Sequence, residues 1–259
     1  VMGIVNMGAP ENHVRFLKNK LGLDTFVEGG TYTGGTALLM SDFFDKVYTI
    51  EKSDEMYEIA RKNISTRKNI SLLKGDTIEH LEKILSENNK LLFWLDAHWS
   101  GGLTYGENDE CPLIQELEII FTQQKNFAIL IDDARQFMAP PPEPHKHYNW
   151  PSLKEIINAL PQGTDITIFE DVIYLVPESI SDEFKIFIQK EITLKWKEYH
   201  ENKKGSISKG IRLAIKGLFN LVQACFSLCV NFESIKAMIA ESLNNPSLGK
   251  NNCFLTKVH

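Results

Sequence analysis

Acidic side chains follow the short apolar runs of this 259-residue sequence at regular places. The acids at the ends of successive runs are Glu28, Glu51, Asp76, Asp96, Asp132 and Asp133. One acid at such a place is usually a turn or capping residue, but six in succession indicate a binding site. Carboxylates accept strong hydrogen bonds from hydroxyl groups and, when grouped, bind hard cations.

A glycine-rich segment, EGGTYTGGT (28–36), follows the first run. Glycine allows positive φ angles and lets a ligand approach the backbone closely. The spacing excludes the dinucleotide motif G-x-G-x-x-G, because Tyr32 stands where its second glycine would be, and no Gly-Lys-Ser/Thr ends the segment as in a P-loop. The remaining pattern is E-x-G-x-x-x-G, formed by Glu28, Gly30 and Gly34.

The elements that must position these residues alternate between strand and helix patterns from residue 24 to about residue 176. We expect strands at 24–28, 46–51, 70–76, 91–98 and 127–135, helices at 36–44, 53–63, 77–87, 112–124 and 152–160, and a hairpin of 166–169 with 172–177. This order predicts an α/β fold with a doubly wound, mostly parallel seven-stranded sheet, an antiparallel terminal hairpin and a helical C-terminal extension. The predicted domains are therefore residues 1–177 and 178–259. In such sheets ligands bind beyond the carboxyl ends of the strands, where the acids lie.

The glycine pattern, followed by acids after the second and third strands, resembles class I S-adenosylmethionine-dependent methyltransferases over roughly residues 16–177. The resemblance implies that the loop with Glu28, Gly30 and Gly34 cradles the methionine part of S-adenosylmethionine. It also implies that Glu51 accepts hydrogen bonds from the ribose hydroxyls and that Asp76 contacts the adenine amino group. Tyr32 replaces a glycine found in many members, and it could either cover the cofactor or pack against the protein.

The acids after the fourth and fifth strands suggest a second feature. Neighbouring parallel strands would bring Asp96, Asp132 and Asp133 together, and such carboxylates repel one another unless a cation such as Mg²⁺ or Mn²⁺ neutralises them. The arrangement resembles metal-dependent O-methyltransferases that act on sugars of macrolide and aminocoumarin antibiotics, in which the matching positions hold Mg²⁺. His98 stands where that family has a proposed general base.

This resemblance implies that the metal lowers the pKa of a substrate hydroxyl while His98 accepts the proton and Asp96 belongs to the catalytic set. An alternative without metal is that Asp132 caps the turn and Asp133 pairs with Arg135. His98 could then be the base of a metal-free enzyme, or could donate to a backbone carbonyl.

Two polar loops flank this cluster. Asp109 and Glu110 are either metal ligands or, as we favour, acids at the start of a helix. The loop 140–150 contains His145, His147, Tyr148 and Trp150. For this loop a plain surface role is favoured over a substrate lid, a metal site or aromatic contacts to a sugar.

The composition of the chain limits the kinds of partner that we expect it to bind. The chain has 28 Lys and Arg residues against 34 Asp and Glu residues, a net charge of −6. This charge argues against a protein that binds along the phosphates of a nucleic acid, so we expect no nucleic-acid partner.

Four irregularly spaced cysteines indicate free thiols and a cytoplasmic location. The apolar segment 211–230 has one polar stripe, for which docking on the body or on a second subunit of a homo-oligomer is favoured over membrane-surface contact through 205–230. No run is long and uncharged enough to span a membrane.

The sequence as a whole predicts an S-adenosylmethionine-dependent O-methyltransferase, assisted by Mg²⁺, whose acceptor is a hydroxyl of a small polyol or glycosyl molecule. Two alternatives remain at this point. The same fold could carry other chemistry, as in hydroxylase-like relatives, or could serve as a non-catalytic module that keeps the cofactor pocket.

Overall fold

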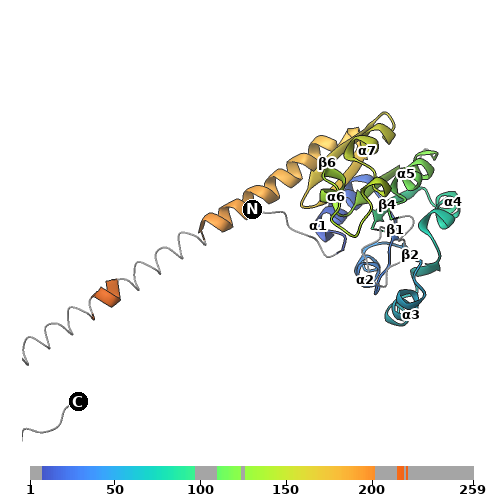
Figure 1. The fold of residues 1–259 in the computed structure, drawn as a ribbon, viewed down its shortest axis with the longest axis horizontal. Coiled ribbons are helices and arrows are strands. Elements are labelled where there is room, and N and C mark those ends of the chain that lie inside the picture. Colours follow the sequence, from blue (N-terminus) through green and yellow to red (C-terminus); the bar gives the residue numbers. More distant parts are fainter. Residues whose placement is uncertain (1–7, 97–109, 124–125, 202–214, 219, 221–259) are drawn as a thin grey trace, which may run out of the picture. The chain divides into compact units, whose positions relative to one another are not determined.

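The computed structural model describes residues 8–96, 110–123, 126–201, 215–218 and 220 (Figure 1). The chain divides into two compact units, residues 1–190 and 191–259, and the elements below belong to the first. Its strands are β1 (Thr25–Gly29), β2 (Lys46–Glu51), β3 (Ile70–Lys74), β4 (Lys90–Leu95), β5 (Asn126–Ile131), β6 (Thr164–Phe169) and β7 (Val172–Pro177). Its helices are α1 (Glu11–Leu21), α2 (Gly35–Met40), α3 (Asp54–Asn63), α4 (Thr77–Glu87), α5 (Leu113–Phe121), α6 (Ala134–Met138) and α7 (Leu153–Ala159), with a short 3₁₀ helix at His147–Asn149.

The seven strands form one sheet in the order β3-β2-β1-β4-β5-β7-β6. The pairs among β1 to β5 are parallel, whereas β7 runs antiparallel to both β5 and β6. The strands β1, β2 and β3 lie side by side toward one edge of the sheet, and the chain then crosses back through α4 so that β4 lies on the other side of β1. This confirms the predicted doubly wound sheet with an antiparallel terminal hairpin, and it creates a topological switch point between β1 and β4.

Apolar side chains on both faces of the sheet form the core. The strands β1 and β4 are buried along nearly their whole length, as expected for parallel strands covered on both sides. On one face α4 packs against α5 and α5 against α7, and Leu81, Leu117 and Ile156 from these helices are buried against the sheet. Helix α1 contacts β4 and β5 with its buried Val14 and Leu17. Each fully buried leucine contributes about 1.5–3 kcal/mol to folding.

Side-chain caps start two helices directly after strands, at the edge where ligands are expected. Ser53 is the N-cap of α3, and its side chain accepts a hydrogen bond from the Met56 N–H. Asp76 caps α4 in a capping box with Glu79. These caps turn the chain sharply after β2 and β3, so residues 51–53 and 76 stay at the carboxyl edge of the sheet.

A helix spans residues 178–201 and begins directly after β7. Its first part belongs to the first unit, where Phe184 and Ile188 are buried and Ser181 and Lys185 both hydrogen-bond to Asp165 on β6. None of the helices in the described part of the chain is long and apolar enough to cross a membrane. Most of the segment 205–230 lies outside the described residues.

Candidate active site

The candidate site lies at the carboxyl ends of β1, β2 and β4, which the register brings level. Gly29 at the end of β1 pairs with Ile50 of β2 on one side and with Leu95 of β4 on the other. Glu51 and Asp96 follow those two partners. The parallel sheet therefore gathers three of the acids predicted from the sequence, Glu28, Glu51 and Asp96, around the glycine-rich loop.

The glycines of this loop are required by its backbone. Gly30 and Gly34 have φ angles of 89° and 87°, in the left-handed region that disfavours other residues. A Cβ on Gly34 would lie 2.8 Å from the Ile64 side chain at the end of α3. Gly34 thus serves the close packing of the loop on α3, and a contact with a cofactor stays a prediction for both glycines.

Tyr32 takes an unusual conformation in the middle of the loop. Its φ angle is 49°, its N–H donates to Glu51 Oε2 at 2.8 Å, and 62% of the tyrosine is exposed to solvent. The ring therefore does not pack into the protein, which removes one of the two roles considered for it. Covering a bound molecule stays a prediction.

Glu51 has a fixed carboxylate. Its Oε1 accepts from the Ser53 N–H at 2.8 Å and its Oε2 accepts from the Tyr32 N–H at 2.8 Å. A carboxylate oxygen has two acceptor sites, so each oxygen can accept a further hydrogen bond. This is the chemistry that binding a pair of ribose hydroxyls requires.

Glu28 lies beneath the loop and is 1% exposed. The Thr49 hydroxyl donates to Glu28 Oε2 at 2.6 Å, and the hydroxyls of Thr49 and Thr31 lie 2.6 Å apart. Burial raises the pKa of Glu28 to about 8, with the nearby charges of Asp96 and Glu51 adding to the effect. The carboxyl group is therefore largely protonated at neutral pH and supports the loop from below.

Asp76 is held by its own helix and by a lysine. Its Oδ1 accepts from the Ile78 N–H, and its Oδ2 pairs with Lys52 Nζ at 2.6 Å. The side chain is 21% exposed, so it reaches the surface of the site. The contact to adenine implied by the resemblance stays a prediction. The lysine partner was not anticipated from the sequence.

The acids after β5 are engaged within the protein. Asp132 Oδ1 accepts from the Asp133 N–H at 2.8 Å. Asp133 has a φ angle of 56°, which ends the strand at Ile131 rather than at the predicted residue 135. Its carboxylate accepts from Arg135 at 2.7 Å and from Gln136 at 2.9 Å.

These contacts do not fit the predicted Mg²⁺ set of Asp96, Asp132 and Asp133. Both carboxylate oxygens of Asp133 bind neighbouring side chains, and Arg135, which also pairs with Asp171, already neutralises it. Within the part of the chain that the structure describes, no three His, Cys, Asp or Glu side chains are grouped to hold a metal ion. The contacts observed are those of the alternative, in which Asp132 accepts from the turn and Asp133 pairs with Arg135, and a metal at this place stays a prediction. His98 and Asp109 lie outside the described residues.

Glu110 is the most enclosed acid of this region, and neither predicted role describes it. It is 0% exposed and accepts from the Lys146 N–H at 3.0 Å and from Trp150 Nε1 at 2.8 Å, with His145 Nδ1 at 3.3 Å. Burial favours the protonated form, but the hydrogen bonds from Lys146, Trp150 and His145 lower the pKa of Glu110 below its ordinary value. Trp150 is buried and Tyr148 is exposed, so the loop presents one aromatic ring to solvent and uses the other for packing.

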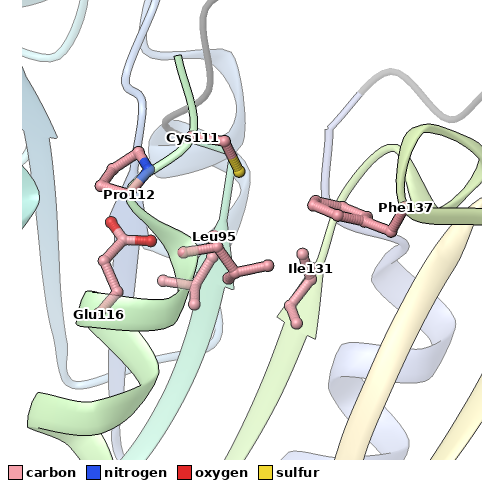
Figure 2. A pocket seen from close by; sticks show the side chains of 7 residues that line it. Leu95, Cys111, Pro112, Glu116, Ile131 and Phe137 are labelled. Atoms are coloured by element: carbon pink, nitrogen blue, oxygen red, sulfur yellow. The ribbon is translucent and has the colours of Figure 1, made fainter. Parts of the chain in front are cut away.

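A small pocket of about 10 Å³, room for about one water molecule, lies beside these residues at the ends of β4 and β5 (Figure 2). Its lining consists of Leu95, Cys111, Pro112, Leu113, Glu116, Ile131 and Phe137. The lining is apolar except for the thiol and the buried carboxyl group of Glu116. The pocket was not anticipated from the sequence, because its walls come from three segments whose contact depends on the fold.

Comparison with known proteins points to methyl transfer. A family model described as RNA cap guanine-N2 methyltransferase matches residues 20–142, just under half of the chain. No curated protein matches.

Solved structures show more distant likenesses. A methyltransferase of Podospora anserina bound to S-adenosylhomocysteine is 18% identical over 66% of this chain and 80% of its own, with a TM-score of 0.48. A precorrin 8W decarboxylase of Methanobacterium thermoautotrophicum is 18% identical over 66% of this chain and 91% of its own, with a TM-score of 0.40. An rRNA methylase of Streptococcus thermophilus is 12% identical over 67% of this chain and 99% of its own, also with a TM-score of 0.40. Because these scores lie below 0.5, the fold assignment rests on the strand order itself.

The fold and the family match confirm the predicted enzyme class, an S-adenosylmethionine-dependent methyltransferase. The prediction that the chain has no nucleic-acid partner is wrong, because the matching family is described by an RNA substrate. That prediction used the net charge of −6, which averages over the whole chain and says nothing of a local surface. The similarity to sugar O-methyltransferases is not confirmed.

Proposed function

We propose that this S-adenosylmethionine-dependent methyltransferase modifies the exocyclic N2 amine of a guanine in RNA. The family match carries the proposal, because residues 20–142 include both the glycine-rich loop with Glu51 and the pocket beside β4 and β5. The matched segment therefore contains both the residues proposed to hold the cofactor, here called the cofactor half of the site, and the residues at the ends of β4 and β5, here called the acceptor half.

The cofactor half fits S-adenosylmethionine. When bound, this cofactor supplies a methyl group on a cationic sulfur, which a nucleophile can displace. Glu51 would hold the ribose hydroxyls, since two backbone N–H groups already fix its carboxylate. Tyr32 would cover the bound molecule with its exposed ring, and Gly30 and Gly34 would give the loop its shape.

The acceptor half lies on the β4 side of this cradle. The Asp96 N–H donates to the Gly29 carbonyl at 3.0 Å, which holds Asp96 where β1 and β4 meet. An amine that gains a methyl group becomes cationic and must release a proton. The half-buried Asp96 carboxylate would accept that proton, and His98 is the second candidate predicted from the sequence.

A hydroxyl acceptor is the second candidate. The position of Asp96 and the buried Asp132 at adjacent strand ends favours it, because carboxylates can orient and deprotonate a hydroxyl group. We derive no magnesium-assisted step, since the oxygens of Asp133 bind Arg135 and Gln136. The cytoplasmic location and the homo-oligomer stay predictions from the sequence.

The test uses the full chain and two RNAs that differ in one amine. One RNA carries a guanosine cap, and the other carries an inosine cap, which lacks the N2 amino group. With methyl-labelled S-adenosylmethionine, we expect label in the guanosine-capped RNA and none in the inosine-capped RNA. Equal labelling of both RNAs would overturn the N2 assignment. Labelling of polyols or glycosides alone would establish the hydroxyl acceptor, and adding a chelator would then test for a metal.

A further inference from the structure

The buried carboxylate of Glu110 connects two loops that are distant in the sequence. It binds the backbone of Lys146 and the indole N–H of Trp150, 36 and 40 residues further along the chain. The His145 ring adds a third contact, with its Nδ1 3.3 Å from Glu110 Oε2. Three neighbouring groups of one loop thus converge on a single carboxylate.

Glu110 directly precedes one wall of the pocket, formed by Cys111, Pro112 and Leu113. Trp150 packs against the other wall, since its ring centroid lies 5.7 Å from that of Phe137. Figure 2 shows Cys111 and Phe137 on either side of the ends of β4 and β5. The connection between the walls is therefore Cys111–Glu110–Trp150–Phe137.

We infer that Glu110 is a positioning residue that holds the two walls of this pocket, beside the proposed acceptor half of the site, at a fixed separation. The inference rests on the proposed function for the identity of the acceptor, but the link between the walls does not. Glu110 does not touch the pocket itself, since the pocket lining starts at Cys111. It acts through the hydrogen bond to Trp150.

The geometry makes this connection stiff. A buried carboxylate that accepts several hydrogen bonds cannot shift without breaking them, and the buried Trp150 N–H would then be left unpaired. Both sides of the connection also have little freedom, because Trp150 is 6% exposed and Phe137 is 4% exposed. The direct link from Glu110 to the aromatic wall is the hydrogen bond of 2.8 Å from Trp150 Nε1 to Glu110 Oε2.

The decisive variant is Trp150→Phe, which keeps an aromatic ring against Phe137 and removes the N–H donor. We expect the acceptor KM to rise about 10-fold while kcat and the Kd for S-adenosylhomocysteine stay within about twofold, since one hydrogen bond to a buried charge is lost and the glycine-rich loop and Glu51 are unchanged. Glu110→Gln, which places an amide N–H₂ among N–H donors, should have a larger effect in the same direction.

The matched control is Glu155→Gln. The exposed carboxylate of Glu155 likewise accepts from a backbone N–H and a side-chain donor, both of Ser152, in the capping box of α7. Its loss should lower the melting temperature without changing the acceptor KM. If Trp150→Phe lowers the melting temperature and leaves the acceptor KM unchanged, Glu110 has only a structural role and the inference fails.

A readout that needs no turnover separates this inference from the proposed function. Cys111 lines the pocket and is half-buried, so its alkylation by iodoacetamide, measured at the Cys111 peptide by mass spectrometry, reports how open the pocket is. We expect faster alkylation in Trp150→Phe than in the wild type and no change in Glu155→Gln. If the wild type methylates no RNA while alkylation rises as expected, the acceptor assignment fails and the positioning role stands. An unchanged alkylation rate overturns the positioning role.

Discussion

Replacing Glu28 by glutamine should remove a large part of the pH dependence of stability. Glu28 is buried under the glycine-rich loop, and its pKa is raised to about 8 by burial and by the charges of Asp96 and Glu51. Glutamine is a neutral side chain of the same size, and its amide oxygen can still accept from the Thr49 hydroxyl. At neutral pH the variant should therefore resemble the protonated wild type.

The sign and size follow from proton linkage. Between the ordinary pKa of about 4.5 and the folded value of about 8, the folded state binds one more proton than the unfolded state, so stability falls as the pH rises. The contribution is complete below about pH 4.5 and disappears as the pH passes through about 8. From pH 5.5 to pH 7.5 the wild type should lose about 2.5 kcal/mol of unfolding free energy through Glu28 alone.

Urea denaturation at pH 5.5, 6.5 and 7.5 measures this difference. The wild type and Glu28→Gln share all other titrating groups, so subtracting the two series isolates Glu28. Glu58→Gln is the matched control, because Glu58 is exposed on α3 and pairs with Arg61 at the surface. Parallel pH series for the wild type and Glu28→Gln would refute the reasoning and show that the carboxyl group is ionised in the folded protein.

Three further outcomes are expected. Glu51→Gln should weaken S-adenosylhomocysteine binding about 10- to 100-fold by calorimetry, because charge-assisted hydrogen bonds are lost, and an unchanged Kd would exclude Glu51 from the cofactor site. Gly34→Ala should lower the unfolding free energy in urea by about 1–3 kcal/mol, since its φ is positive and Ile64 leaves no room, whereas wild-type stability would contradict the loop geometry. Asp165→Asn should reduce stability by about 1 kcal/mol at pH 7, because burial raises the pKa of Asp165 but the hydrogen bond from Lys185 lowers it below its ordinary value. The difference between the variant and the wild type should vanish as the pH falls below the folded pKa of Asp165, and equal melting temperatures at pH 7 would disprove the prediction.

Local signals in the sequence predicted the elements around the proposed cofactor residues well. Strand β2 has the predicted bounds 46–51, and α3 begins within one residue of the predicted start at 53. These features depend on residues within a few positions of one another. Glu51 was therefore placed at the edge of the sheet from the pattern alone.

The acceptor half could not be predicted in this way, because its contacts join distant segments. Asp133 was considered a metal ligand, but Arg135 neutralises it and also pairs with Asp171, 36 residues away on the terminal hairpin. Glu110 is buried by a loop that follows it by 35 to 40 residues. A pattern shows that an acid is present and cannot show which distant cation or donor the fold brings to it.

The crossover from β3 to β4 separates the two halves of the proposed site along the chain. The glycine-rich loop, Glu51 and Asp76 all precede β4, whereas Cys111, the lining of the pocket and the Glu110 connection all follow it. Under the proposed function, insertions, deletions or exchanges after residue 96 would alter what is methylated and leave the proposed cofactor residues untouched. The sheet order would then make the chain modular, with one segment for the methyl donor and a later segment for the acceptor.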